Sequence, residues 1–320
     1  MLSAALLILG LVIIALGSNW LVEGAASVAR SLQVSDLVIG LTIVSFGTSA
    51  PELAVNLFAS FGGNTEIAIG NVLGSNIFNI AVILGISAVI HPIYVTSNTV
   101  WIEIPLTLLA AIMIGVCAND VLLDNVAVSQ ITRSDGLALL GFFMVFMYYS
   151  YFVAKKNKAD SKPDETPKYP LFKSFFLIGI GLGGLIAGGK LMVDSAVSIA
   201  KLLGLSENII GITIVATGTS LPELATSVAA ALKKSPDIAL GNVVGSNIFN
   251  VFLILGLSSV LRPLPFNETA NFDIGMTVFV SVLLLIFAFV GRSRTISRLE
   301  GAILFAFYVL YIWYLLSHGS

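Results

Sequence analysis

The stretch VSFGTSAPELAVN (Val44–Asn56) decides the fold, and it returns with few changes as VATGTSLPELATS (Val215–Ser227). Each copy places a carboxylate, Glu52 or Glu223, inside a long apolar run, where a bare charge is costly. Each copy also places a proline directly before that carboxylate, and a proline inside a helix removes a backbone hydrogen bond and bends the chain. Two unfavourable features that occur together twice indicate a functional site and not simple packing.

The composition is that of an integral membrane protein. Of 320 residues, 57% are hydrophobic and 11% are charged, whereas a soluble domain carries about 25% charged residues. The net charge of −2 argues against nucleic acid as a partner. The single cysteine, Cys117, excludes a disulfide framework and is interpreted as a packing residue. The N-terminal run has no basic leader region, so we interpret it as a first spanning helix and not as a cleaved signal.

The apolar segments predict an all-α integral membrane protein. A spanning helix needs about 20 mostly apolar residues. Ten segments meet this requirement, at approximately 2–28, 37–61, 66–90, 98–117, 135–154, 172–200, 208–232, 237–260, 271–291 and 298–317. The polar stretch 155–170 has the composition of a solvated linker, and it separates two five-helix halves, 1–154 and 171–320. The prolines predict that helices 2 and 7 are kinked.

The two halves contain a repeat. Residues 38–85 align without a gap with residues 209–256 at an offset of 171, and 27 of the 48 positions are identical. Because each half has an odd number of predicted helices, we expect the second copy to enter the membrane with the opposite orientation. Inverted repeats of this kind are typical of secondary transporters, whose substrate site lies near the bilayer midplane between the repeats.

The basic residues predict the orientation in the membrane. Cytoplasmic loops are enriched in Lys and Arg. If the N-terminus lies outside, the cytoplasmic side receives most of these residues, including the linker lysines, while the opposite side keeps mainly Arg133, Lys201 and Arg262. We therefore expect a multi-pass protein of the cell membrane, with both termini outside and the linker 155–170 in the cytoplasm. We expect it to act as a monomer.

The polar residues of each copy line up at helical spacing. Thr48 and Ser49 share a helix face with Glu52, and Asn71, Ser75 and Asn79 share a stripe of the next helix. The second copy repeats the set with Thr219, Ser220, Glu223, Asn242, Ser246 and Asn250. All of these side chains offer oxygen atoms, which suit hard cations such as Ca²⁺ and Na⁺ and not zinc or copper. The roles of Asn71 and Asn242 stay open at this stage. Asn76 and Asn247 fall off the stripe and are expected to brace neighbouring backbone.

The proline and the nearby glycine add backbone oxygens to this set. Pro51 leaves the carbonyl of Gly47 without its helical partner, and a freed carbonyl at membrane depth is tolerated when it faces protein or a water-filled cavity. Other acidic residues attract less interest: we interpret Glu103 as an ordinary helix-end charge and Glu23 as interfacial or structural. The sequence contains no nucleotide-binding motif and no catalytic triad, so we expect neither an enzyme nor a cofactor.

These motifs resemble those of the cation/calcium exchanger superfamily, specifically its prokaryotic sodium/calcium exchanger branch. The patterns G-T-S-x-P-E and G-S-N-I-x-N of that family occur here as GTSAPE and GTSLPE, each followed by GSNIFN. The resemblance covers nearly the whole chain. It implies Na⁺-driven exchange of Ca²⁺ by alternating access, in which the first helix of each half slides against a core of the others. It implies as ion ligands the backbone carbonyls of Ser45 and Ala216 and the side chains of Thr48, Ser49, Glu52, Ser75, Asn79, Thr219, Ser220, Glu223, Ser246 and Asn250.

The chain departs from the family at one position. Many members carry an aspartate where this chain has Asn250, so only two carboxylates remain in the expected site, which weakens the case for potassium coupling. One Ca²⁺ or two Na⁺ would neutralise Glu52 and Glu223, and a third Na⁺ would make the exchange electrogenic. A proton/calcium antiporter remains the alternative, although the G-N-x-x-E pattern of that branch is absent. A passive cation channel and a receptor without ion flux also remain open.

Overall fold

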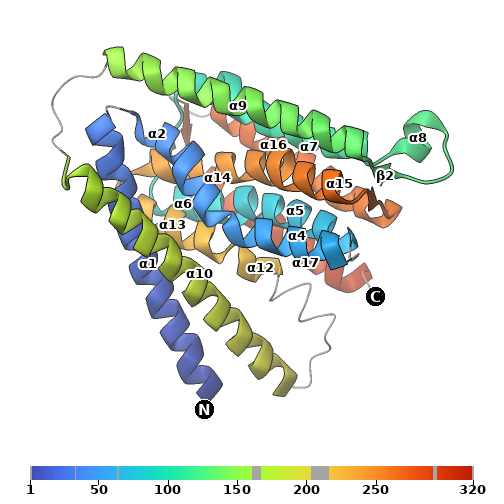
Figure 1. The fold of residues 1–320 in the computed structure, drawn as a ribbon, viewed down its shortest axis with the longest axis horizontal. Helices are drawn as coiled ribbons and strands as arrows, with labels where there is room; N and C mark the ends of the chain where they lie inside the picture. The colour runs from blue at the N-terminus through green and yellow to red at the C-terminus, as the bar shows by residue number, and fades with distance from the viewer. Residues whose placement is uncertain are drawn as a thin grey trace.

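The computed structural model describes residues 2–32, 34–62, 65–160, 167–202, 216–290 and 294–318, and most of these residues are helical (Figure 1). The helices of the first half are α1 (Leu2–Leu32), α2 (Asp36–Ile39), α3 (Ser45–Thr48), α4 (Ala50–Gly62), α5 (Thr65–Phe78), α6 (Gly85–Ile90), α7 (Ile104–Cys117), α8 (Asp120–Asp124) and α9 (Arg133–Asp160). Those of the second half are α10 (Leu171–Leu202), α12 (Ala216–Thr219), α13 (Leu221–Leu232), α14 (Pro236–Ile248), α15 (Gly256–Leu261), α16 (Asn271–Val290) and α17 (Arg298–His318).

Short turns of other geometry interrupt or precede these helices. Among the residues that the structure describes, four are π-helical: η1 (Gly40–Val44), η2 (Asn79–Leu84), η3 (Thr99–Glu103) and η5 (Phe249–Leu255). One, η6 (Glu268–Ala270), is 3₁₀. Two-residue strands, which an all-α prediction does not include, pair antiparallel across the halves. They are β1 (Ile93–Tyr94) with β4 (Thr295–Ile296), and β2 (Gln130–Ile131) with β3 (Leu264–Pro265).

The expected segments agree with the helices to within a few residues at most ends. Among the described residues, eight helices are long and apolar enough to cross a membrane, or nine if the bent pair 36–48 and 50–61 is one span. The expected segment 208–232 is described only from Ala216, where α12 and α13 follow, so the count of ten stays a prediction. The helix α9 extends to Asp160, six residues into the stretch expected to be a linker.

Two continuous spans form the centre of the bundle. Buried residues make up 94% of the apolar stretch in Pro236–Leu261 and 78% of that in Ala68–Ile90, but at most 44% in the other spans. These two spans lie in the middle of the bundle, with α9 along one side (Figure 1). A helix that is apolar all round is expected at such a central position. The same two spans carry the G-N-V-x-G-S-N-I-F-N motifs, so the polar residues of those motifs are enclosed by protein.

The helices α1 and α10 pack closely against each other through glycines. A Cβ atom added at Gly17 would lie 2.8 Å from the carbonyl oxygen of Gly181, and one at Gly188 would lie 2.9 Å from that of Gly10. These contacts pair early residues of α1 with late residues of α10, so the two helices run antiparallel. Small residues permit such close backbone contact between membrane helices. The pair lies at an angle to the central spans and extends beyond them (Figure 1).

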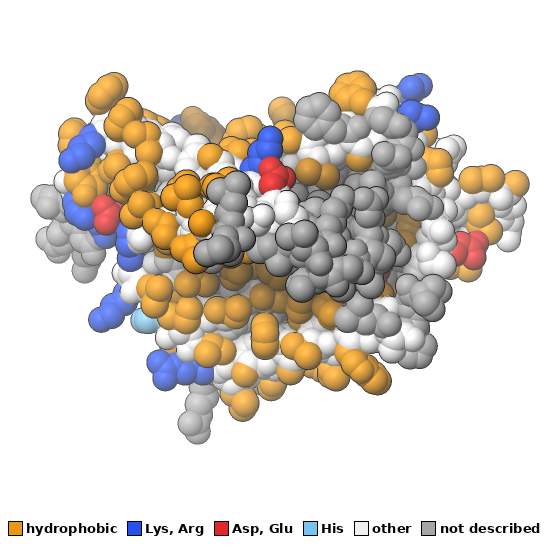
Figure 2. All heavy atoms as spheres, turned by 90° about the horizontal axis from the view of Figure 1, so that it is seen from below, with side chains coloured by type: hydrophobic (Ala, Val, Ile, Leu, Met, Phe, Trp, Pro, Cys, Tyr) orange, Lys and Arg blue, Asp and Glu red, His pale blue; other side chains and the backbone are white. Residues whose placement is uncertain are grey.

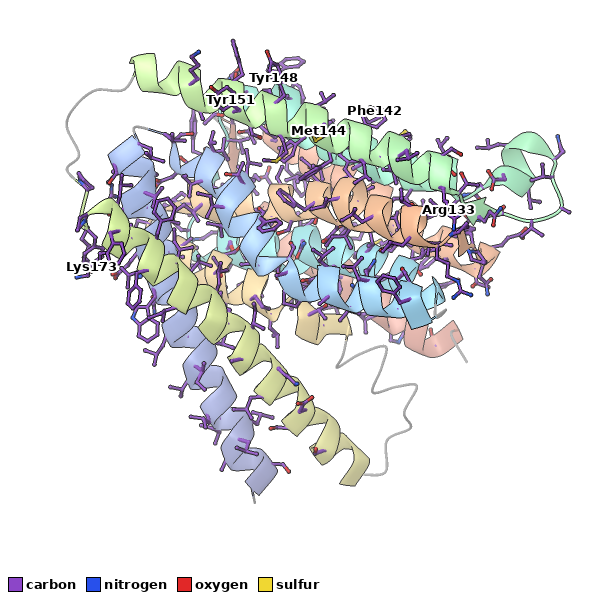
Figure 3. The ribbon with its side chains drawn as sticks, viewed as in Figure 1. Arg133, Phe142, Met144, Tyr148, Tyr151 and Lys173 are labelled. Carbon is purple, nitrogen blue, oxygen red and sulfur yellow. The ribbon has the colours of Figure 1, made fainter. Side chains whose placement is uncertain are left out.

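The outer surface fits a lipid environment. On α9, Phe142 stacks on Phe252 of η5 with ring centroids 5.4 Å apart, whereas Met144, Tyr148 and Tyr151 point away from the bundle and are 65–71% exposed (Figure 3). The face seen in Figure 2 is covered over its described part mainly by hydrophobic side chains, with most Lys and Arg near its edges. Apolar side chains exposed over several helices are typical of a protein that is surrounded by hydrocarbon. The chain is a multi-pass membrane protein.

Candidate ion-binding site

The helix that carries the first motif breaks at Ser49. Its φ and ψ of −80° and 7° end α3, and α4 begins at Ala50 with an axis bent by 43° from the preceding segment. Ser220, at −86° and 6°, separates α12 from α13 in the same way. In both cases the proline two residues further on cannot donate a backbone hydrogen bond, which favours a break. The kink expected in helix 2 is confirmed, and the second motif is broken at the equivalent residue.

The two broken helices bring the two motifs together. The hydroxyl of Ser49 donates to Oε1 of Glu223 at 2.9 Å and lies 3.0 Å from Oγ of Ser246. The equivalent contacts run in the other direction: the hydroxyl of Ser220 donates to Oε1 of Glu52 at 3.0 Å and lies 3.1 Å from Oγ of Ser75. All six side chains are at most 3% exposed. The polar residues of the two copies therefore form a single buried cluster in which each copy contacts the other.

Four oxygen atoms in and beside this cluster have no hydrogen-bond partner. They form two pairs at the repeat offset: Oε2 of Glu52 and of Glu223, and Oδ1 of Asn79 and of Asn250. A buried oxygen without a donor costs free energy. All four atoms are acceptors, and carboxylate and amide oxygens are the ligands that Ca²⁺ prefers. No group of three or more His, Cys, Asp or Glu that could hold a metal ion occurs in the described part of the chain. Any cation held here would therefore depend on two carboxylates completed by neutral oxygens.

The threonines of the motifs are oriented by asparagines of the opposite copy. The hydroxyl of Thr48 donates to Oδ1 of Asn242 at 3.0 Å, and that of Thr219 donates to Oδ1 of Asn71 at 3.3 Å. The sequence leaves the roles of Asn71 and Asn242 open, and in the structure they accept hydrogen bonds from the threonines of the cluster.

Two further residues support these asparagines, and the sequence analysis missed them. Asn56 accepts a hydrogen bond from Nδ2 of Asn71 at 2.7 Å, and Ser227 accepts one from Nδ2 of Asn242 at 3.0 Å. Both are fully buried. They occupy equivalent positions, four residues after Glu52 and Glu223. The sequence signal by which they could have been found is a polar residue one helical turn after each glutamate, within an apolar segment.

The two predicted backbone ligands, Ser45 and Ala216, each begin the short helix before the break, α3 or α12. The carbonyl of Ser45 accepts the backbone N–H of Ser49 at 2.9 Å and lies 3.4 Å from the hydroxyl of Thr48. The hydroxyl of Ser45 donates to the carbonyl of Gly40 at 2.7 Å and lies 3.1 Å from that of Asn242. Ala216 begins α12, directly after the stretch that the structure does not describe.

The interpretation of Glu103 as an ordinary helix-end charge was wrong. This residue is fully buried in η3, and its Oε1 accepts the phenol hydrogen of Tyr149 at 2.5 Å. The prediction failed because Glu103 lies near the start of a spanning segment in the sequence, whereas α9 folds over it and removes it from solvent.

Glu23 has the structural role that the sequence suggested. Its carboxylate forms ion pairs with Lys168 at 3.1 Å and with Lys233 at 3.2 Å, and it also accepts from Tyr169 at 3.0 Å. Hydrogen bonds to Tyr169 and Glu23 raise the pKa of Lys168 above its ordinary value. These contacts fasten α1 to the end of α13 and to the residues before α10. The equivalent residue of the second copy, Asp194, is exposed.

A family model and several relatives match this chain over nearly its full length. The family model described as "Sodium/calcium exchanger protein" matches residues 2–152 and 173–317, which leaves the whole expected linker, 155–170, outside the match. The putative antiporter CaxA of Alkalimonas amylolytica is 37% identical over 326 aligned positions, which cover 99% of this chain and 100% of that protein. The sodium/calcium exchanger MaX1 of Methanosarcina acetivorans is 34% identical, over 96% of both chains.

A solved structure has the same fold. The sodium-calcium exchanger NCX_Mj, soaked with 2.5 mM Na⁺ and 0.1 mM Ca²⁺, superposes with a TM-score of 0.83 at 36% identity, and 98% of each chain is covered. The match of the family model to both halves, together with relatives of this identity over nearly the full length, leaves one conclusion. The chain belongs to the sodium/calcium exchanger family, whose members are membrane antiporters and not enzymes.

Proposed function

We propose that this protein is a secondary active antiporter that exchanges Na⁺ for Ca²⁺ by alternating access. The observation that carries the proposal is the set of four partnerless acceptor oxygens on Glu52, Glu223, Asn79 and Asn250. A cation among them would compensate both the missing hydrogen bonds and the two carboxylate charges. The same two carboxylates would bind either ion, so Ca²⁺ and Na⁺ would compete for one site. Competition for a single site in which both ions are bound alternately produces exchange.

We propose the full ligand set that the motifs imply. It consists of the backbone carbonyls of Ser45 and Ala216 and the side chains of Thr48, Ser49, Glu52, Ser75, Asn79, Thr219, Ser220, Glu223, Ser246 and Asn250. The burial of the described side chains and their contacts between copies support this set. Two carboxylates are balanced by one Ca²⁺ or by two Na⁺. A third Na⁺ would leave one net positive charge, and its movement would be worth about 2.3 kcal/mol per 100 mV. We therefore propose electrogenic exchange.

The architecture proposed for transport is ten helices arranged as two inverted repeats, 1–154 and 171–320. The antiparallel contact of α1 with α10 supports inversion, because these helices begin the two halves and correspond at the repeat offset. Close glycine contacts hold these two helices to each other, which suits movement of the pair as one unit against the central spans. The distribution of Lys and Arg supports termini outside and the linker 155–170 in the cytoplasm. We propose a monomer in the cell membrane.

Uptake of radiolabelled Ca²⁺ into proteoliposomes tests the proposal. Vesicles loaded with Na⁺ and diluted into Na⁺-free buffer should accumulate Ca²⁺, whereas vesicles loaded with choline should not. An outward proton gradient without Na⁺ provides the comparison with a proton/calcium antiporter. If exchange is electrogenic, clamping the membrane potential at zero with valinomycin and K⁺ should change the uptake rate.

Each alternative gives its own result in this assay. Uptake driven by the proton gradient alone would replace the proposal with proton/calcium antiport. Uptake that is independent of both gradients would indicate a passive channel. The absence of Ca²⁺ flux from correctly folded protein would favour a receptor role.

A further inference from the structure

Two asparagines that are absent from the proposed ligand set contact two that belong to it. Nδ2 of Asn79 donates to Oδ1 of Asn247 at 3.0 Å, and Nδ2 of Asn250 donates to Oδ1 of Asn76 at 3.0 Å. Both bonds join one repeat to the other. All four side chains are at most 2% exposed. Each ligand asparagine is therefore held by a residue of the opposite repeat.

Asn76 and Asn247 are themselves fixed by the backbone. Nδ2 of Asn247 donates to the carbonyl of Asn76 at 3.2 Å, and Nδ2 of Asn76 lies 3.5 Å from the carbonyl of Asn247. Because their nitrogen atoms face these carbonyls, their oxygen atoms face Asn79 and Asn250. The sequence analysis expected these two residues to brace neighbouring backbone, and that expectation is confirmed. It did not anticipate the second contact that each one makes.

The second contact determines which atom of Asn79 and Asn250 faces the ion site. An asparagine amide offers a donor on one side and an acceptor on the other, and rotation by half a turn exchanges them. With Nδ2 bound to the opposite asparagine, Oδ1 is the free atom, and it is the atom without a partner in both residues. A rotated amide would instead present N–H hydrogens to a cation, which would repel it. The assignment of the four amides is mutually consistent, because reversing any one of them would place two oxygens or two nitrogens against each other.

We propose that Asn76 and Asn247 are positioning residues for ion binding, each of which locks the amide of the opposite repeat's ligand asparagine so that its oxygen faces the cation. This proposal rests on the proposed function and names how the neutral ligands of that site are oriented. Residues that orient a metal ligand from behind typically contribute 10- to 100-fold to affinity. A residue that only braces the backbone would affect folding stability without changing ion affinity.

A rescue experiment separates these two roles. Asn247→Leu removes the accepting oxygen at similar volume, and we expect it to raise the half-saturating Ca²⁺ concentration about 10- to 100-fold with a smaller change in maximal rate. A carboxylate has two equivalent oxygens and needs no locking, so Asn79→Asp in the Asn247→Leu background should restore most of the affinity. Asn76→Leu should behave in the same way and should be rescued by Asn250→Asp. Each aspartate should rescue only the variant of its own partner, because the hydrogen bonds are specific.

The control is an amide pair outside the cluster, in which Asn119 is buried and Asn271 is exposed. Nδ2 of Asn119 donates to Oδ1 of Asn271 at 2.9 Å, and this contact joins the residues after α7 to the start of α16. Asn119→Leu should leave the half-saturating Ca²⁺ concentration unchanged. Thermal unfolding would verify that all variants are folded, and Asn247→Ala and Asn76→Ala would replace any leucine variant that is not.

Two results would overturn the inference. One is an unchanged Ca²⁺ affinity in folded Asn247 and Asn76 variants, and the other is rescue that does not depend on which aspartate is introduced. If the wild-type protein exchanges Ca²⁺ for Na⁺ and these variants keep its Ca²⁺ affinity, Asn76 and Asn247 are not positioning residues. The proposed function is unaffected by that result. Absence of exchange in the wild type would instead remove the proposed function.

Discussion

Replacing Glu52 with glutamine should abolish Na⁺-driven Ca²⁺ uptake. The hydroxyl of Ser220 can still donate to the glutamine oxygen as it does to Oε1 of Glu52, so the fold should persist. The group that replaces the partnerless Oε2 is an amide nitrogen, which carries no negative charge and directs hydrogens toward the cluster. Two unit charges 4 Å apart interact by about 4 kcal/mol at the effective dielectric of a protein, and a divalent cation doubles this to about 8 kcal/mol.

The loss of affinity should therefore be large. If half of the interaction is offset by the lower cost of burying a neutral group, about 4 kcal/mol remains, which corresponds to roughly a thousandfold weaker Ca²⁺ binding. The assay is radiolabelled Ca²⁺ uptake over a range of Ca²⁺ concentrations in vesicles loaded with Na⁺. Glu103→Gln is the matched control, because it removes another fully buried carboxylate that lies outside the cluster. Normal Ca²⁺ affinity in Glu52→Gln, or equal loss in Glu103→Gln, would refute the assignment of Glu52 to the site.

Three further predictions concern the neutral ligands and the break in the first motif. Potassium should neither drive nor be required for exchange, because Asn79 and Asn250 are both neutral; a strict K⁺ requirement during Na⁺-driven uptake would contradict this. In Asn250→Asp, a protonated carboxyl can donate to Oδ1 of Asn76 as the amide does, so transport should be nearly wild-type at low pH and change its Na⁺ or Ca²⁺ response as pH rises. Asn79→Asp should do the same against Asn247, and indifference of both variants at every pH would place these residues outside the site. Gly47→Ala would place a Cβ against Cδ2 of Leu182 in α10, so the Leu182 side chain would have to move. Overpacking of this kind costs about 1–3 kcal/mol, so the exchange rate should fall several-fold and Leu182→Ala should restore it; failure of Leu182→Ala to restore the rate would indicate that another contact is responsible.

Local patterns in the sequence were sufficient to predict much of the fold. Long apolar runs predict spanning helices because a helix satisfies its backbone hydrogen bonds in lipid within a single segment. The position of Pro51 predicts a break because the missing N–H acts on the adjacent turn, and the break occurs at Ser49. The two-residue strand pairs were not predicted, since a pairing such as Ile93 with Ile296 depends on contacts far apart in the chain.

The sequence predicted which residues belong to the candidate site, but it did not predict which of them contact each other. Spacing places Thr48 and Glu52 on one face, but it does not reveal that Thr48 contacts Asn242 in the other repeat. Helical periodicity describes neighbours along one helix, whereas these bonds depend on how two broken helices approach. Glu103 shows the same limitation, because its burial depends on α9, and no local pattern connects it with Tyr149.

The hydrogen bonds between the repeats have a consequence for how the sequence can evolve. Ser49 donates a hydrogen bond to Glu223, and Ser220 donates one to Glu52, so the glutamate of each motif depends on a serine of the other. A substitution in one copy therefore changes a contact made by a residue of the other copy, which is encoded about 171 codons away in the same gene. We expect changes of cation preference to require compensating substitutions in both halves.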